Sequence, residues 1–345
     1  MHSGGCRLEN TDVIRVENLK TYFHTEQGII KAVDGVSFSA KHRKVLGVVG
    51  ESGCGKSITA LSIMQLLPKP HGRIESGHIW FDRGGAAGVI DLAAVNPKSR
   101  LMQEIRGNDI AMIFQEPMTS LNPVYTIGEQ IVEAVLLHQK VSKKEAWDRA
   151  VEMLAHVGIP SPAQRAKEYP HQMSGGMRQR AMIAMALSCN PRFLIADEPT
   201  TALDVTIQAQ ILDLMSRLQD EHEMSIMMIT HDLGVVARMC DDVVVMYLGK
   251  IIERAEVRTL FRNPSHPYTQ GLLASIPTMG DRKKRLNPIE GTVPEPFNLP
   301  AGCRFRPRCP RAMDICTQEP PEVRIAEGHE VKCWLYEQSG EVLAG

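Results

Sequence analysis

One stretch of eight residues constrains the fold of this 345-residue chain more than any other. Residues 50–57 read Gly-Glu-Ser-Gly-Cys-Gly-Lys-Ser and match the phosphate-loop pattern G-x-x-x-x-G-K-[ST] at every fixed position. The apolar run 45–49 precedes the loop, and a helical stretch at 58–67 follows it. The sequence therefore predicts a buried strand, a loop around phosphate groups, and a helix whose positive end faces them.

Each part of this loop has a chemical reason. Its glycines let backbone N–H groups turn toward phosphate oxygens, Lys56 reaches the β- and γ-phosphates, and the Ser57 hydroxyl is a ligand for Mg²⁺. We therefore predict an ATP and Mg²⁺ site. Its contacts are Gly50, Glu51, Ser52, Gly53, Cys54, Gly55, Lys56, Ser57 and Ile58. The loop alone fits a kinase, a GTPase, a helicase or a transport motor equally well.

The composition is that of an ordinary folded protein, with 43% hydrophobic and 23% charged residues. The net charge of −1 gives no sign of binding to nucleic acid or to an anionic membrane. There is no apolar run long enough for a transmembrane helix, and residues 1–10 do not resemble a signal peptide. We expect a cytosolic protein that reaches the membrane only through partners.

The strand signals predict an α/β protein. Apolar runs at 110–114, 193–196, 225–230 and 243–248 alternate with helical segments, which indicates a largely parallel sheet. Residues 13–23 and 29–39 alternate in polarity, as in an antiparallel sheet of two or three strands. A capping box at Ser142 and Glu145 starts one helix of a helical insertion.

Two acidic residues follow the run 193–196. Asp197 is placed to face Mg²⁺ and its water ligands, and Glu198 is placed to polarise the attacking water as a general base. A strand that ends in two solvated acids is common by itself, but the phosphate loop upstream favours the catalytic interpretation.

A second glycine-rich helix start lies at Ser174, Gly175 and Gly176. It forms another anion-binding helix terminus. One nucleotide does not need two such termini from one chain. We therefore predict that these residues meet the γ-phosphate of an ATP that another subunit holds.

The order of motifs resembles the nucleotide-binding domain of ABC transporters over about residues 13–255. The motifs are the phosphate loop, Gln115 after a strand, Ser174-Gly-Gly, Asp197-Glu198, Thr201-Ala-Leu-Asp204 and His231. The resemblance implies a P-loop NTPase core of ABC type, with an antiparallel β subdomain and a helical subdomain. The domains expected are a tail at 1–12, the nucleotide-binding domain at 13–258 with helices at about 116–190, and an extension at 259–345.

The same resemblance assigns further roles. Gln115 would contact Mg²⁺ and the attacking water, and His231 would form a hydrogen bond to the γ-phosphate, so that both join Glu198 as catalytic residues. Asp204 would face the opposite nucleotide site. The adenine ring is expected to stack on Phe23, with Tyr22 as the alternative.

The segment Asn263-Pro-Ser-His-Pro-Tyr268 resembles the tail of ATP-binding subunits from oligopeptide and dipeptide importers. That implies a peripheral subunit at the cytoplasmic face of the cell (inner) membrane, which powers peptide uptake. Its partners would be a second, related ATP-binding subunit, two integral-membrane permease subunits and an extracytoplasmic substrate-binding protein, without nucleic acid. Nickel, glutathione or an oligosaccharide stays open as cargo, as does a soluble ABC-type ATPase that acts on nucleic acid or ribosomes.

The extension from about residue 260 is rich in proline and is expected to have little regular structure. It contains four cysteines within 31 residues: Cys303, Cys309, Cys316 and Cys333. In a reducing compartment such a cluster favours metal binding over disulfides. Zinc sites usually pair cysteines two to four residues apart, so the wider spacing favours a [4Fe–4S] cluster, which the importer branch also implies.

Zinc, free thiols or disulfides remain alternatives for the four cysteines, and a redox-sensing role is compatible with transport. Four arginines accompany these cysteines. They are expected either to offset thiolate charge or to form a solvated basic loop: Arg304, Arg306, Arg308 and Arg311.

Overall fold

The computed structural model describes residues 11–115, 120–201, 203–275, 289–338 and 341–343. Nearly all of the predicted tail at 1–12, and residues 116–119 after Gln115, lie outside these ranges. None of the described helices is both long and apolar enough to cross a membrane.

A nine-stranded sheet forms the centre, in the order β13-β11-β12-β10-β9-β3-β8-β7-β6. The five strands from β9 to β6 are parallel, as the apolar runs predict. The strands are β3 (Val45–Val49), β6 (Ile110–Ile113), β7 (Phe193–Asp197), β8 (Ser225–Ile229), β9 (Asp242–Tyr247), β10 (Lys250–Glu256), β11 (Glu322–Ala326), β12 (His329–Lys332) and β13 (Glu341–Val342).

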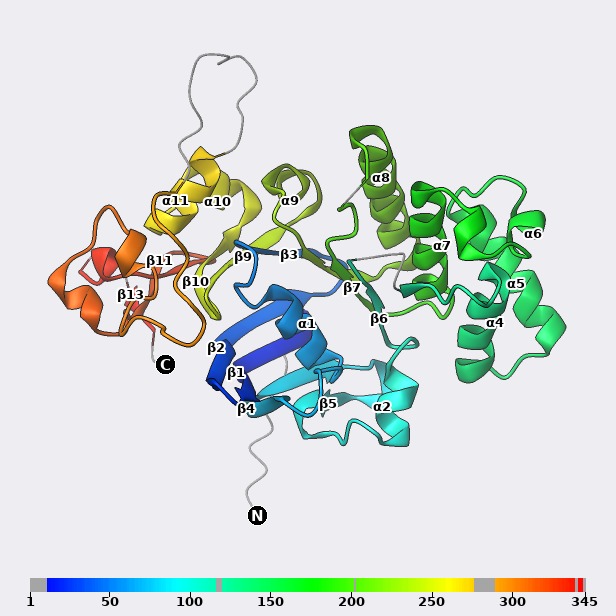
Figure 1. Ribbon diagram of the computed structural model, residues 1–345, viewed down its shortest axis with the longest axis horizontal. Helices are drawn as coiled ribbons and strands as arrows, with labels where there is room; N and C mark the ends of the chain where they lie inside the picture. Colours follow the sequence, from blue (N-terminus) through cyan, green and yellow to red (C-terminus); the bar gives the residue numbers. More distant parts are fainter. Residues whose placement is uncertain (1–10, 116–119, 202, 276–288, 339–340, 344–345) are drawn as a thin grey trace.

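An antiparallel sheet of four strands lies below it in Figure 1, in the order β2-β1-β4-β5. Its strands are β1 (Asp12–Thr25), β2 (Gly28–Lys41), β4 (Gly72–Asp82) and β5 (Val89–Asp91). The sequence predicts two or three strands in this sheet, whereas the structure has four. The reason is that β4 and β5 come after the phosphate loop and its helix, so that their pairing with β1 is not visible in the local sequence pattern.

Helices cover both faces of the central sheet. They are α1 (Lys56–Ile63), α2 (Arg100–Ile105), α4 (Ile127–His138), α5 (Lys143–His156), α6 (Pro162–Arg165), α7 (Gly175–Leu187), α8 (Val205–His222), α9 (Leu233–Met239), α10 (Val257–Arg262) and α11 (Pro267–Ala274). Successive residues of β3 enter different cores, as expected for alternating side chains. Leu46 and Val48 pack with α1, α2 and the four-stranded sheet, whereas Val45 and Val49 pack with α7, α8 and α9.

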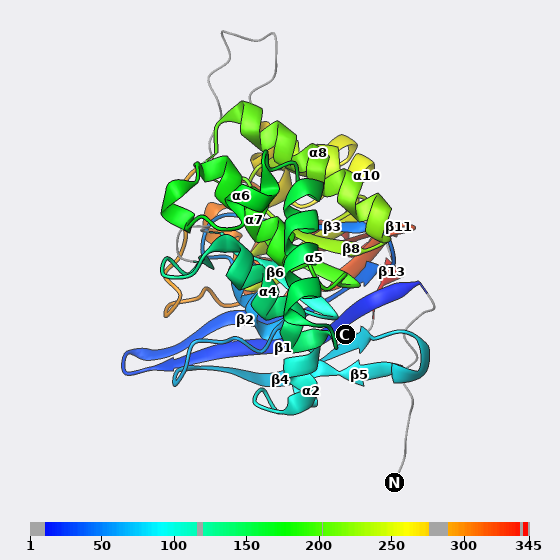
Figure 2. The same cartoon turned by 90° about the vertical axis from the view of Figure 1, so that its right-hand side faces the viewer.

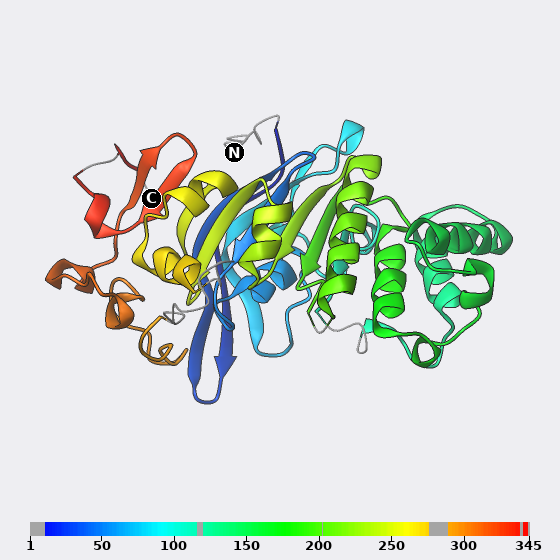
Figure 3. The same cartoon turned by 90° about the horizontal axis from the view of Figure 1, so that it is seen from above.

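The predicted helical subdomain consists of α4 to α7, which lie in front in Figure 2. Ser142 and Glu145 form the predicted capping box of α5, and Thr126 and Glu129 form another at α4. Such a box satisfies two N–H groups at the helix start that have no intrahelical partner. Figure 3 places this subdomain and the C-terminal extension at opposite ends of the molecule.

The extension is more regular than its sequence indicates. Strand β12 pairs antiparallel with β10, and β11 pairs with β12, so that the extension continues the edge of the central sheet. These strands are short and rich in charged residues, with Glu322, Arg324, Glu330 and Lys332 among them. They do not show the apolar runs of the other strands, and the edge of β10 provides the partner that makes them strands.

Candidate functional site

The phosphate loop connects β3 to α1 through three glycines with positive φ. The φ angles are 150° at Gly50, 78° at Gly53 and 106° at Gly55. A Cβ atom on Gly50 would lie 2.2 Å from the carbonyl oxygen of Met246, and one on Gly55 would lie 2.3 Å from that of Ala32. Only glycine fits at either position, because a side chain would meet both strain and backbone atoms.

Lys56, the first residue of α1, turns its ammonium group back over this loop. The side chain is buried, with a residue exposure of 6%. Its Nζ donates hydrogen bonds to the carbonyl oxygens of Gly50 at 2.8 Å and of Glu51 at 3.1 Å. The loop therefore combines inward-turned backbone with a fixed positive charge, which is the chemistry that binds phosphate.

Asp197 ends β7 as a buried carboxylate beside the loop. Burial raises the pKa of Asp197, and a hydrogen bond with the Ser57 side chain opposes that rise. Its Oδ1 atom is buried and has no hydrogen-bond partner among the described residues. A carboxylate oxygen of this kind beside a hydroxyl fits Mg²⁺, which prefers oxygen ligands and completes its shell with water and phosphate.

Glu198 brings the three predicted catalytic side chains together. Its Oε2 accepts hydrogen bonds from Gln115 Nε2 at 3.1 Å and from Thr201 Oγ1 at 2.8 Å. Its Oε1 lies 3.0 Å from Nδ1 of His231. Burial disfavours the charged form, but the hydrogen bonds of His231 and Thr201 prevail and lower the pKa of Glu198. The result is an ionised carboxylate at the ends of β6, β7 and β8, suited to polarise a water molecule.

The backbone of Glu198 is unusual as well, with a φ of 48°. A residue other than glycine rarely adopts this left-handed conformation, and such strain concentrates at functional sites. The sequence places Thr201 within a motif but assigns no role to it. Its spacing could have indicated one, because Thr201 follows Glu198 by three residues in a turn, where its N–H donates to the Glu198 carbonyl oxygen.

Residues 174–176 lie at the start of α7, on the other face of the central sheet from α1. Ser174 caps α7, and its Oγ accepts the N–H of Met177 at 3.3 Å. Asp204 caps the neighbouring α8, which α7 meets closely, since a Cβ atom on Gly176 would lie 3.0 Å from Ile207. Helices α7 and α8 pack on the face of the central sheet opposite to α1 (Figure 1). Thus the structure groups Ser174 with Asp204, apart from α1.

The two aromatic candidates for adenine differ in their surroundings. The Tyr22 hydroxyl donates a hydrogen bond to Asp34 at 2.6 Å, and the Lys31 ammonium lies 5.8 Å from the Tyr22 ring centre. Phe23 lies against Gly72 of the neighbouring strand, where an added Cβ atom would come within 2.8 Å of its ring. Tyr22 is therefore part of a polar network.

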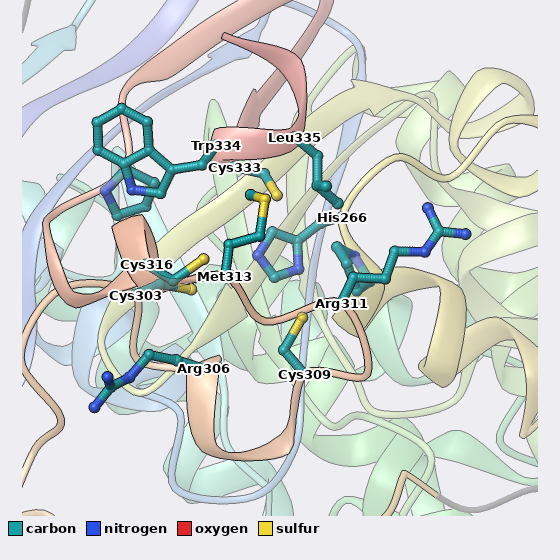
Figure 4. Close-up of a pocket in the computed structure, with 12 residues that line it drawn as sticks. His266, Cys303, Arg306, Cys309, Arg311, Met313, Cys316, Cys333, Trp334 and Leu335 are labelled. Carbon is teal, nitrogen blue, oxygen red and sulfur yellow. The ribbon is translucent and has the colours of Figure 1, made fainter.

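The four predicted cysteines line one pocket in the extension (Figure 4). All four are free thiols, so the disulfide alternative does not hold for them in this structure. Burial raises the pKa of Cys303, of Cys309 and of Cys333, the last to about 11. Across the described ranges, no three His, Cys, Asp or Glu side chains are arranged to hold a single metal ion.

Two of the four arginines neither pair with the cysteines nor lie in a solvated loop, in contrast to both predictions. Arg308 forms a two-pronged ion pair with Glu51 of the phosphate loop, with distances of 2.7 and 3.1 Å. Arg304 pairs with Asp34 and donates to the carbonyl oxygen of Leu248. Both guanidinium groups are nearly buried. Arg306 and Arg311 do line the cysteine pocket.

Comparison with known proteins identifies the family. The sequence profile described as "ABC transporter" matches residues 33–201, and the one described as "Oligopeptide/dipeptide transporter, C-terminal region" matches 252–316. The chain is 54% identical to the oligopeptide transport ATP-binding protein AppD of Bacillus subtilis, over 95% of this chain and 98% of that protein. It belongs to the ATP-binding proteins of ABC transporters. The dipeptide transport ATP-binding protein DppD of the same organism is 50% identical, over 96% of this chain and 98% of its own length.

Solved structures agree with this family. A dimeric post-hydrolysis structure of the ATP-binding cassette MJ0796, bound to ADP and Pi, superimposes with a TM-score of 0.62 at 26% identity, covering 71% of this chain and 99% of that one. CbiO1 from Clostridium perfringens, part of the ABC transporter complex cbiONQ, gives 0.59 at 26% identity, covering 74% of this chain and 92% of that one. This ABC protein is therefore an ATPase, and ATP is its substrate.

Proposed function

We propose that this ABC ATPase powers the uptake of dipeptides or oligopeptides from the cytoplasmic face of the cell membrane. The relatives named for oligopeptide and dipeptide transport, and the match of the extension to the corresponding C-terminal profile, support this cargo class. The observation that supports the motor role is the Glu198 carboxylate, which is held between Gln115 and His231 and lies next to the buried Asp197.

The side chains divide the chemistry of hydrolysis among them. The loop N–H groups and Lys56 bind the phosphates, and Ser57 with Asp197 would hold Mg²⁺, which neutralises phosphate charge when bound. Glu198 accepts a proton from the attacking water. The oxygen of this water then bonds to the γ-phosphorus, and the bond between the γ-phosphorus and the β,γ-bridging oxygen breaks. Gln115 orients that water, and His231 donates a hydrogen bond to the γ-phosphate.

A complete site takes two chains in this proposal. Ser174, Gly175, Gly176 and Asp204 would face the ATP of a second, related ATP-binding subunit, because their helices lie on the opposite face of the sheet from α1. Two permease subunits and an extracytoplasmic substrate-binding protein complete the importer. Phe23 would stack on adenine, since Tyr22 is engaged with Asp34.

The proposal is tested by expressing the tagged chain with candidate permease subunits and measuring ATP hydrolysis in liposomes. We expect co-purification of two membrane subunits and of a second ATP-binding chain, with hydrolysis stimulated by peptide and its binding protein. Stimulation by nickel, glutathione or an oligosaccharide in place of peptide would show that the importer carries that cargo. Stimulation by nucleic acid, with no membrane subunit bound, would contradict the motor role.

We further propose that the four cysteines hold a [4Fe–4S] cluster. Four soft thiol groups from one segment surround a single pocket, which suits such a cluster. Zinc is the alternative, because four thiolates can also bind one tetrahedral zinc ion.

Anaerobic purification with iron, zinc and absorption analysis tests the cluster. We expect about four irons for each chain, lost in a Cys309→Ser variant. One zinc and no iron in the wild-type protein would contradict the cluster and support the alternative.

A further inference from the structure

The extension contacts the phosphate loop through Glu51. The Arg308 guanidinium, with a side-chain exposure of 4%, donates to both carboxylate oxygens of Glu51. The hydroxyl of Tyr268 accepts the backbone N–H of Glu51 at 2.8 Å. These contacts join residues that are 257 and 217 positions apart in the sequence.

Glu51 is in turn tied to Lys56. Its carbonyl oxygen accepts a hydrogen bond from Lys56 Nζ, so that its carboxylate, its N–H and its carbonyl oxygen are all engaged. The extension holds the first two of these groups, and the phosphate-binding lysine holds the third. A shift of the extension at Glu51 therefore acts on the lysine that reaches the phosphates.

The extension holds its own two contact residues firmly. Tyr268 is fully buried and packs against Phe305 of the extension, with ring centres 5.4 Å apart, and against Tyr247 at the end of β9, at 4.7 Å. Arg308 also donates to the carbonyl oxygens of Glu290 at 3.2 Å and Ile289 at 3.3 Å. Both contacts are therefore anchored on the side of the extension as well as at the loop.

We propose that Arg308 and Tyr268 are positioning residues of the nucleotide site, through which the extension sets the affinity of the phosphate loop for ATP. The loop contains three glycines with positive φ and would lose much conformational freedom when it binds phosphate. Contacts that order it beforehand reduce this cost. The inference rests on the proposed ATP site. By linkage, bound ATP stabilises the extension in return, including the segment with Cys303 and Cys309.

The test measures MgATP affinity and steady-state hydrolysis with the full-length protein. Arg308→Ala is expected to raise both Kd and KM about five- to tenfold, because a charge-assisted pair is lost, while kcat changes by less than about twofold. Tyr268→Phe removes only the hydroxyl and is expected to raise both about two- to threefold. Arg262→Ala, which removes an exposed arginine from α10, is the matched control and leaves both unchanged.

Two further measurements separate positioning from general stability. In a double-mutant cycle, E51Q/R308Q binds MgATP no more weakly than either single variant. Hydrogen exchange in residues 303–311 slows with MgATP in the wild type but not in Arg308→Ala. If Arg308→Ala is unstable, the double-mutant cycle and the Tyr268→Phe variant test the inference instead. Unchanged affinity in those variants, or an equal loss in Arg262→Ala, overturns the inference. A wild-type protein that binds no ATP would instead overturn the proposed function.

Discussion

The nucleotide-binding core and the C-terminal extension are held together in different ways. Every residue of β3, β7 and β8 is buried, and the core around them is built from apolar side chains. By contrast, the small apolar cluster under β11 and β12 has three buried members in the described part of the chain: Val323, Val331 and Cys333. Burial of apolar surface stabilises the core and also holds Tyr268 and Phe305 of the extension, whereas strands β11 and β12 depend more on specific polar contacts.

The buried carboxylate of Glu253 is an example of such polar contacts. Glu253 of β10 accepts the N–H groups of Ser265 at 2.7 Å and His266 at 2.9 Å, and its Oε1 lies 2.8 Å from Nε2 of His329. All four residues are buried. The core should therefore tolerate exchanges between apolar residues, while these strands of the extension depend on single partners, because an unpaired buried polar group is costly.

The largest effect is expected in the chemistry of the core. Glu198→Gln should lower the hydrolysis rate by about 10²- to 10⁴-fold, because a neutral amide cannot accept the proton of water. ATP binding should persist, as measured by equilibrium nucleotide binding beside phosphate release. The exposed Glu152→Gln on α5 serves as the control. Normal turnover in Glu198→Gln would contradict the general-base role.

A second variant addresses the extension alone. Glu253→Ala should destabilise it by about 3 kcal/mol, because His329 and two N–H groups lose their buried partner. Urea denaturation with limited proteolysis should show cleavage within the extension before the core unfolds. Exposed Glu256→Ala, on the same strand, should behave as wild type. If both variants lose the same stability, the extension does not depend on this contact.

The third prediction concerns stability within the catalytic site. Burial raises the pKa of Asp197, so the ionised carboxylate is less stable in the folded protein than in the unfolded chain. Asp197→Asn should then stabilise the protein without nucleotide or metal by about 1 kcal/mol, or about 2 °C in Tm, while it impairs Mg²⁺-dependent hydrolysis.

The sign of the pH dependence follows from the same shift. A folded-state pKa above the unfolded value means that the wild-type protein regains this stability as pH falls through the raised pKa, so the advantage of Asp197→Asn shrinks in acid. Glu198→Gln is the matched control, because the pKa of Glu198 is lowered and its charge is favoured. Thermal denaturation in chelator checks both, and a gain in Tm for both variants would refute this account.

A final pair of variants distinguishes the two aromatic residues. Phe23→Ala should raise KM for ATP about tenfold if the ring stacks on adenine, since such stacking contributes about 1–3 kcal/mol. Tyr22→Phe keeps the ring and loses only its bond to Asp34, so KM should change by less than about twofold. If Phe23→Ala leaves KM unchanged while Tyr22→Ala, which removes the ring, raises it about tenfold in the same titrations, adenine stacks on Tyr22 instead.

The sequence alone determined the chemistry of the core. The phosphate loop, the Asp197–Glu198 pair and the strands around them were predictable, because each is a contiguous motif whose geometry depends on near neighbours and whose order along the chain is informative. The capping box of α5 was predictable for the same reason. The catalytic roles of Glu198, Gln115 and His231 remain predictions, although the structure brings the three side chains together.

The contacts between distant segments become visible in the folded structure alone. The pairing of β4 and β5 with β1, the strands of the extension, and the contacts of Arg304 and Arg308 with Asp34 and Glu51 all join residues far apart along the chain. A local pattern cannot specify such partners, because they depend on how the whole chain packs. For the same reason Arg308, next to Cys309, was expected either to offset thiolate charge or to lie in a solvated loop, whereas in the structure it pairs with Glu51 of the phosphate loop.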